Sequence, residues 1–242
     1  MIVANKMNKV LAEILRTNRV TDGAEEFSLH SAMSPEEGSV ITAVFAATRP
    51  NVSVEVGFAY GISTLYVCDA LAENQKPAKH FVIDPFQRTH WHGIGLQNIV
   101  RAGYGDVISL IEEKSEIALP KLLSEGTRVQ AAIIDGMHTF DHALVDFFYI
   151  NKMLDVGGIV IFDDADHNSL MPLMRHVSTY PAYRVFMTTA PMIAVQMRTK
   201  IRRAIGKLTR LSTFSRSSDY PSCVAFQKIA ADERNWDWHA PF

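Results

Sequence analysis

Apolar residues near the start of the chain recur at every third or fourth position. Between residues 3 and 17 they alternate with charged side chains, a spacing that places them on one side of a helix. The pattern therefore predicts an amphipathic N-terminal helix. We expect this helix to pack on its own domain; the alternative is a contact with a second subunit in a homodimer. The residues of the apolar stripe are Val3, Met7, Val10, Leu11, Ile14 and Leu15.

A second helix has its own start signal. Ser34 is a favourable N-cap, Pro35 suits the first helical position, and Glu37 completes a capping box. We expect this helix to end near Thr48, before Pro50. The segment between the two helices is rich in Thr, Asp, Gly and Ser, a composition that predicts a loop.

Beyond this helix, short β-rich runs alternate with helical runs. The expected strands cover residues 52–56, 81–83, 107–111, 131–134, 158–162, 183–187 and 223–229. The expected helices cover residues 63–72, 96–103, 117–123, 142–154 and 170–180. Strands separated by helices predict a doubly wound, mostly parallel α/β sheet with helices on both faces.

Composition narrows the class of protein. A chain of 242 residues suits one large α/β domain, which we place at residues 31–242 after an N-terminal helical extension of residues 1–30. The hydrophobic share of 48% and the charged share of 21% are typical of a soluble protein. No apolar run is long enough for a transmembrane helix, and a net charge of −2 provides no overall attraction for nucleic acid. We expect a cytoplasmic protein.

One region, about residues 190–220, departs from this balance. Residues 167–218 contain no Asp or Glu, whereas basic residues accumulate between 198 and 216 around apolar positions. This pattern predicts a basic amphipathic helix in an excursion between two strands. A solvated face is the simplest interpretation; a lid over an anionic substrate and a contact with a membrane surface are the alternatives. The residues are Arg198, Lys200, Arg202, Arg203, Lys207, Arg210 and Arg216, around Ile201, Ile205, Leu208 and Leu211.

The segment 54–64 has the features of a cofactor-binding turn. Gly57, Ala59 and Gly61 allow a tight turn and a close approach to a ligand. The helix that begins near Ser63 offers free N–H groups to an anionic group. Asp84 ends the next strand, where an acid can bind ribose hydroxyls.

The same segment separates two cofactor classes. Its spacing is G-x-A-x-G, whereas a dinucleotide site has G-x-G-x-x-G. We also expect Glu55 to repel a pyrophosphate, but to be compatible with a cationic sulfonium ligand. S-adenosylmethionine is therefore favoured over NAD, and a turn without a ligand is the remaining alternative.

Three acids follow two apolar strands. Asp135 ends one strand, and Asp163 and Asp164 end another, at the edge where open α/β sheets build their sites. Three carboxylates at one edge repel each other unless a cation lies between them, and hard oxygen ligands suit Mg²⁺. The alternative is that Asp163 and Asp164 only cap the following helix.

Together these motifs resemble the class I S-adenosylmethionine-dependent O-methyltransferases. Within this class they resemble the metal-dependent branch that contains catechol O-methyltransferase and the macrolide sugar O-methyltransferases. The resemblance covers about residues 30–180, beginning at the segment 33–38. It implies a seven-stranded, Rossmann-like sheet whose last strand is antiparallel.

The resemblance also implies roles for individual residues. The segment from Glu55 to Ser63 would hold the methionine end of the cofactor, Asp84 the ribose and Ser115 the adenine. Asp135, Asp163 and Asp164 match the family's metal ligands, and Asp135 is expected to lie against the cofactor as well. His138 takes the position of the family's general base, and a histidine suits this role because it titrates near neutral pH.

The sequence therefore predicts a methyltransferase that depends on a divalent metal and acts on a hydroxyl of a small molecule such as a sugar or natural product. Three alternatives stay open. The chain could be a methyltransferase-like subunit that binds without turnover, an NAD-dependent oxidoreductase, or an RNA methyltransferase that uses the basic helix. The near-neutral charge argues against the last of these.

Overall fold

The computed structural model describes residues 7–74, 76–209 and 218–241 of the chain. Of the residues named in the predicted helices, Val3, Arg210, Leu211 and Arg216 lie outside the described part.

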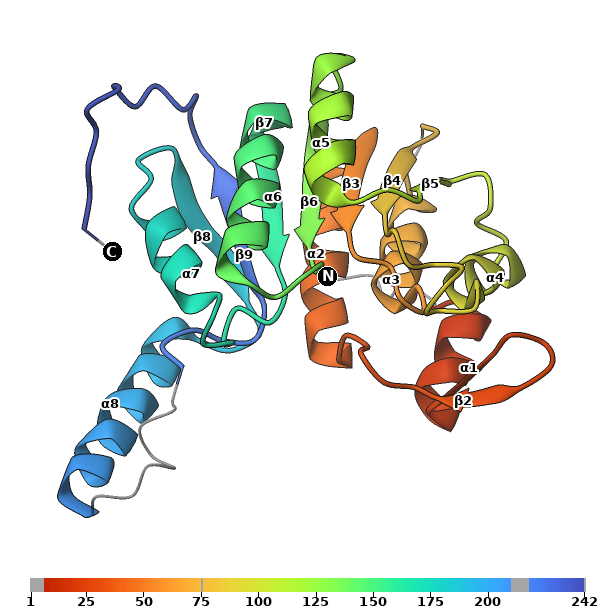
Figure 1. Ribbon diagram of the computed structural model, residues 1–242, viewed down its shortest axis with the longest axis horizontal. Coiled ribbons are helices and arrows are strands. Elements are labelled where there is room, and N and C mark those ends of the chain that lie inside the picture. The colour runs from red at the N-terminus through yellow and green to blue at the C-terminus, as the bar shows by residue number, and fades with distance from the viewer. Residues whose placement is uncertain (1–6, 75, 210–217, 242) are drawn as a thin grey trace.

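The centre of the structure is a seven-stranded sheet in the order β5-β4-β3-β6-β7-β9-β8 (Figure 1). Every strand pair is parallel except the two that involve β9, which runs antiparallel to both β7 and β8. The predicted doubly wound sheet with an antiparallel last strand is thus confirmed. The strands are β3 (Val52–Val56), β4 (Lys79–Ile83), β5 (Ile108–Ile111), β6 (Val129–Ile134), β7 (Leu154–Phe162), β8 (Tyr183–Thr188) and β9 (Val224–Lys228).

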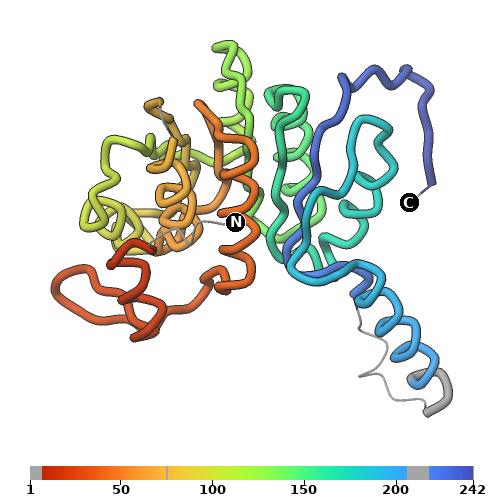
Figure 2. The backbone as a smooth tube through the Cα atoms, turned by 180° about the vertical axis from the view of Figure 1, so that it is seen from behind, coloured from red at the N-terminus to blue at the C-terminus, as the bar shows by residue number. Residues whose placement is uncertain are grey.

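Helices cover both faces of this sheet (Figures 1 and 2). The layer on one face contains α2 (Pro35–Thr48), α3 (Ile62–Leu71) and α4 (Ile94–Arg101), with α1 (Lys9–Thr17) packed against α3. The other face packs against α5 (Ser115–Ser124), α6 (Phe140–Met153) and α7 (Met171–Ser178). An eighth helix, α8 (Met192–Thr209), lies between β8 and β9 in the chain.

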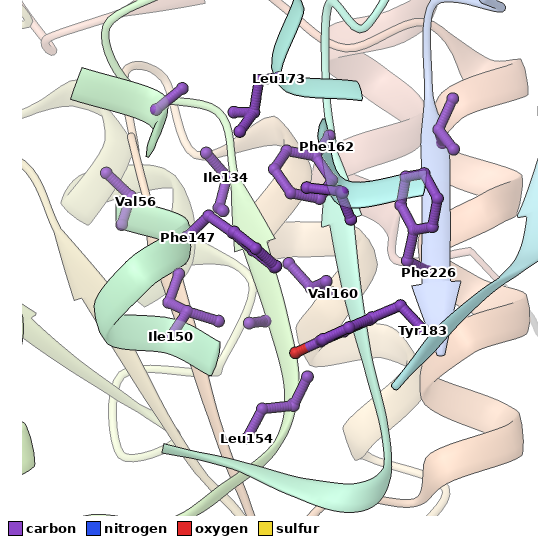
Figure 3. Close-up of a cluster of buried hydrophobic side chains, with 14 of the residues drawn as sticks. Val56, Ile134, Phe147, Ile150, Leu154, Val160, Phe162, Leu173, Tyr183 and Phe226 are labelled. Atoms are coloured by element: carbon purple, nitrogen blue, oxygen red, sulfur yellow. The ribbon is translucent and has the colours of Figure 1, made fainter. Parts of the chain in front are cut away.

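The strands are apolar on both sides because both faces are covered. On β3, Val54 and Val56 belong to the core under α5, α6 and α7. On β6, Ile133 belongs to the opposite core, while Ile134 joins the first. Figure 3 shows Phe147 of α6 packed over β6 and β7, beside Tyr183 of β8. Its ring lies 5.7 Å from that of Phe162.

Local sequence signals explain where several elements begin. Ser34 caps α2 with the predicted capping box, in which Glu37 bonds back to the Ser34 backbone. The N-terminal helix also forms, beginning at Lys9, and buries Leu11 and Ile14 in the core of its own chain.

The predicted loop after this helix is partly wrong. It contains a short antiparallel hairpin of β1 (Arg19–Thr21) and β2 (Glu26–Ser28). The Asp22 side chain accepts hydrogen bonds from the backbone N–H groups of Ala24 and Glu25 and holds the turn. Three-residue strands are too short to show an alternating pattern, so only the Asp22-Gly23 pair indicated a hairpin turn.

The packing of α6 gives a direct stability test. Phe147 is 1% exposed, whereas its neighbour Phe148 is 52% exposed. Because a buried phenylalanine leaves a cavity when truncated, we expect Phe147→Ala to lower the free energy of unfolding by about 3–5 kcal/mol. Phe148→Ala is the matched control and should change it by less than about 1 kcal/mol. Urea unfolding followed by circular dichroism measures both, and equal losses would contradict this packing.

Candidate functional site

A cavity of about 720 Å³ opens at the carboxyl ends of the central strands. The residues that follow β3, β4, β6 and β7 meet there because backbone hydrogen bonds tie these strand ends side by side. Two predicted site residues, Glu55 and Gly61, do not line the cavity. Those that do are Gly57, Ala59, Ser63, Asp84, Ser115, Asp135, His138, Asp163 and Asp164.

The turn between β3 and α3 needs its small residues. Gly57, Ala59 and Gly61 all have positive φ, at 96°, 45° and 77°, a region that favours glycine. Gly57 has a second constraint, because a Cβ there would lie 2.0 Å from the Asp135 carbonyl oxygen. The turn therefore passes directly against the end of β6, which joins the expected cofactor end of the cavity to the acid cluster.

Asp84 holds this turn in place. One of its carboxylate oxygens accepts hydrogen bonds from the backbone N–H groups of Phe58 at 3.2 Å and Ala59 at 3.0 Å. The other accepts the N–H of Phe86 at 2.7 Å. Asp84 thus shapes the turn by bonds within the protein, and any ribose contact would come in addition to them.

Glu55 is not where the sequence interpretation placed it. Its side chain is fully buried beneath the cavity, where it accepts hydrogen bonds from Thr64 Oγ1 at 2.6 Å and His80 Nε2 at 3.0 Å. Ser53 Oγ contacts the other ring nitrogen of His80 at 2.8 Å. Because alternate side chains of a strand point to opposite faces, Glu55 faces the layer of α3. The expectation that it would repel a pyrophosphate in the turn is therefore wrong.

His138 lies between two of the predicted metal-binding acids. Its Nε2 is 3.3 Å from Asp135 Oδ1, and its Nδ1 is 2.8 Å from Asp164 Oδ2. Hydrogen bonds to these carboxylates raise the pKa of His138 to about 10, and the bond to His138 lowers the pKa of Asp164. The imidazole is therefore protonated at neutral pH in this arrangement and donates to both acids.

Asp163 lacks the contact with His138 that Asp135 and Asp164 make. Among the described residues, its buried Oδ1 has no hydrogen-bond partner. Burial, followed by repulsion from Asp135, Glu37 and Asp164, raises the pKa of Asp163 to about 9. A buried carboxylate without a cation is costly, so this position favours either a proton or a positively charged group.

No group of three His, Cys, Asp or Glu side chains within residues 7–74, 76–209 and 218–241 is arranged to hold a metal ion as it stands. The donor chemistry nevertheless fits one. Three carboxylates line the same cavity, and one buried carboxylate oxygen has no bond within the described chain. In this arrangement the His138 ring is bonded to two of the three proposed ligands.

Several residues that line the cavity had no role in the sequence prediction. Glu37 lines it as well as closing the capping box of α2. Tyr60 lies against Trp91, with the two rings 5.1 Å apart and nearly perpendicular, and its hydroxyl contacts His30 Nε2 at 2.8 Å. The sequence offered only the weak signal of an aromatic loop at residues 90–93. His142 also lines the cavity.

A further buried acid, Asp146, interacts with Ser115. Asp146 of α6 is almost fully buried, and within the described part of the chain its Oδ1 has no hydrogen-bond partner. Burial raises the pKa of Asp146 to about 6, although a hydrogen bond from Ser115 acts in the opposite direction. Ser115, which is expected to contact the adenine, is therefore hydrogen-bonded to a buried carboxyl group.

Comparison with known proteins fits this geometry. Residues 54–165 match the family model for a methyltransferase domain. This segment of the chain is similar to a methyltransferase domain. The match spans the turn at Gly57, Asp84, His138 and the pair Asp163–Asp164, so the predicted resemblance to a methyltransferase is confirmed for residues 54–165, which supply most of the cavity lining. The metal-dependent branch stays a prediction. No curated protein sequence matches the chain.

Solved structures extend the likeness over the whole methyltransferase fold. An O-methyltransferase from Bacillus cereus in complex with SAH has 14% sequence identity and a TM-score of 0.65, covering 93% of each chain. The O-methyltransferase TomG from Streptomyces achromogenes, involved in tomaymycin synthesis and solved with SAM, has 12% identity and a TM-score of 0.63, covering 94% of this chain and 93% of that one. At these identities the likeness shows the fold, and the predicted Rossmann-like methyltransferase fold is confirmed.

The close approach of the turn between β3 and α3 to the end of β6 can be tested by substitution of Gly57. Gly57→Ala combines a positive φ with a Cβ that meets the Asp135 carbonyl, so we expect the thermal unfolding midpoint to fall by more than in a variant that has the strained φ alone. Gly126→Ala is the control, because its φ is +78° but no described atom lies within 4 Å. It should cost only the backbone strain of about 1–2 kcal/mol. Equal destabilisation by the two changes would argue against the close approach.

Asp146 gives a pH-dependent prediction. Because its pKa is raised in the folded state, the folded protein binds this proton more tightly than the unfolded chain. The stability that Asp146 contributes is therefore lost as the pH rises from about 4 to about 6. Asp146→Asn removes this loss, so above pH 6 the variant should be more stable by about 3 kcal/mol, with the difference shrinking toward pH 4. Urea unfolding across this range checks it, and a pH-independent difference would contradict it.

Proposed function

We propose that this protein transfers the methyl group of S-adenosylmethionine to a hydroxyl oxygen of a small-molecule acceptor, with the help of a divalent cation such as Mg²⁺. The observation that carries the proposal is the single cavity that joins the Gly57 turn to the His138 and aspartate cluster. A methyl transfer needs a cofactor pocket and an acceptor site in direct contact, since the two reacting atoms must be held close together.

At the cofactor end, the start of α3 supports an anionic group. Gly61 precedes α3 and no described side chain caps this helix, so its first N–H groups are available to a ligand. Ser63 lines the cavity beside them, which fits the carboxylate of the methionine moiety. Asp84 and Ser115 line the same cavity, and we propose the ribose and adenine contacts there.

At the acceptor end, Asp135, Asp163 and Asp164 would hold the cation. When bound, it would draw electron density from an acceptor hydroxyl and lower the pKa of that hydroxyl. An acceptor with two neighbouring oxygens, such as a vicinal diol of a sugar, suits this arrangement because Mg²⁺ commonly retains positions for substrate oxygens.

We propose that His138 takes the hydroxyl proton. Both ring nitrogens of His138 contact carboxylates, Nε2 that of Asp135 and Nδ1 that of Asp164. These contacts raise the pKa of His138 to about 10, and a group with this pKa is protonated at neutral pH and cannot accept a proton. The role of base therefore requires that these carboxylates engage another positive charge, which would release the imidazole. The same acids would thus bind the cation and, in doing so, free His138 to accept a proton.

A binding subunit without turnover is the second candidate. Both candidates bind S-adenosylmethionine, so they differ only in whether an acceptor is methylated. Calorimetric titration with S-adenosylmethionine, with Mg²⁺ and then with chelator, tests the shared step, and an NAD titration is the control. We expect S-adenosylmethionine binding under both conditions and no NAD binding. Absence of S-adenosylmethionine binding in both would reject the proposal.

Variants test the chemistry once a screen of sugar and phenolic acceptors has identified a substrate. We expect His138→Ala to lower the rate by about 10²–10⁴-fold and Asp164→Asn to remove the stimulation by Mg²⁺, while both retain S-adenosylmethionine binding. His239→Ala, at an exposed position, is the matched histidine control and should leave the rate unchanged. Full activity of Asp164→Asn in chelator would contradict the metal assignment.

A further inference from the structure

Helix α8 extends away from the rest of the molecule. Figures 1 and 2 show it projecting from one end of the sheet, with little of its length against other elements. It follows β8, which runs parallel to β7 because both strands are antiparallel to β9. The chain therefore enters α8 at the same edge of the sheet where Asp163 and Asp164 follow β7.

One side of α8 faces the protein. Thr199 is buried, and its hydroxyl donates to the backbone carbonyl of Ser218. Arg203 bonds to Asp219 at 3.1 Å, and Met192 packs against the core at the start of the helix. These contacts fix the rotation of the helix about its own axis.

The opposite side of α8 is apolar and exposed. Ile193, Met197 and Ile201 are 73%, 58% and 56% exposed. They are spaced four residues apart, and since each residue turns an α-helix by about 100°, they form one continuous stripe. The same rotation places Thr199 on the far side of the helix. The stripe therefore points away from the protein.

Positive charge lies on both sides of this stripe. By the same helical rotation, Lys200 lies next to Ile193 and Arg198 lies beyond Ile201, and both side chains are exposed. The sequence of α8 contains five arginines and lysines and no acidic residue. An apolar stripe between basic flanks is the arrangement by which a helix lies in a membrane interface, with the apolar side chains in the acyl region and the cations at the phosphates.

We propose that α8 binds the surface of an anionic lipid bilayer, with Ile193, Met197 and Ile201 inserted and Arg198 and Lys200 at the lipid headgroups. The positive charge of α8 favours an anionic bilayer over a second copy of the chain, since pairing two α8 helices would bring like charges together. The apolar stripe favours a lipid bilayer over a nucleic acid, because the charged phosphate backbone offers no apolar surface on which these side chains could be buried.

The proposed contact is a surface contact. No helix in the described part of the chain is long and apolar enough to cross a membrane. Because α8 starts at the edge of the sheet that holds the acid cluster, binding through α8 would keep that edge close to the lipid. This inference does not depend on the proposed methyl transfer.

The test is co-sedimentation of the full chain with vesicles of phosphatidylcholine, with and without phosphatidylglycerol. We expect binding only to the vesicles that contain phosphatidylglycerol, weakening as salt is added. The triple variant Ile193→Ser, Met197→Ser and Ile201→Ser should weaken binding by about tenfold or more. The pair Arg198→Gln and Lys200→Gln should also weaken it, and should reduce its salt dependence.

Two matched controls separate the stripe from general surface effects. Val100→Ser with Val156→Ser replaces exposed apolar residues elsewhere, and Lys9→Gln with Arg16→Gln replaces exposed basic residues of α1. Both should bind vesicles as the unchanged protein does. Since all the replaced side chains are exposed, the thermal unfolding midpoints should agree within a few degrees.

Three outcomes would overturn the proposal. The first is no binding to anionic vesicles. The second is concentration-dependent self-association in analytical ultracentrifugation that the stripe variant abolishes, which would assign the stripe to a second copy of the chain. The third is binding to a nucleic acid duplex or single strand with none to vesicles, which would assign the cations to that partner.

Discussion

The structure depends most on how one edge of a parallel sheet accommodates three clustered carboxyl groups. Asp135, Asp163 and Asp164 line the same cavity, and only two of them share the imidazolium of His138. Charges taken out of water require a partner. The third acid, Asp163, has its pKa raised by burial and by its acidic neighbours. An edge with more acids than cations favours either a proton or a positively charged ligand, and this requirement links the fold to the proposed chemistry.

The rest of the domain positions this edge. Parallel strands end together, and the backbone bonds between Gly57, Ile83, Val56 and Asp135 keep the ends of β3, β4 and β6 aligned. The glycine turn approaches Asp135 so closely that no side chain fits between them. The proposed cofactor end and the proposed acceptor end of the cavity are thus parts of one backbone arrangement. Helix α8 is built differently, since it makes few contacts with the core and presents its apolar side outward.

Local sequence determined most of the fold and the residue types of the site. The capping box at Ser34 and Glu37 started α2 at Pro35, as predicted, because a cap involves only residues three positions apart. The alternation of strands and helices was readable because each element buries a whole face. The acids after β6 and β7 were readable because a charged residue that ends an apolar strand marks the sheet edge. The hairpin of β1 and β2 was missed because its strands are too short to show a period.

Only the tertiary structure decided which of these side chains face one another. Glu55 stands in the predicted cofactor segment, but the pleat of β3 turns it to His80, which lies on the neighbouring strand. Glu37 appeared only as part of a cap, yet the position of α2 brings it to the cavity. The family resemblance predicted His138 as a base, whereas its pKa depends on Asp135 and also on Asp164, which follows a different strand. Sequence spacing determines contacts within one element, while contacts between elements, and the charges they stabilise, depend on how the elements pack.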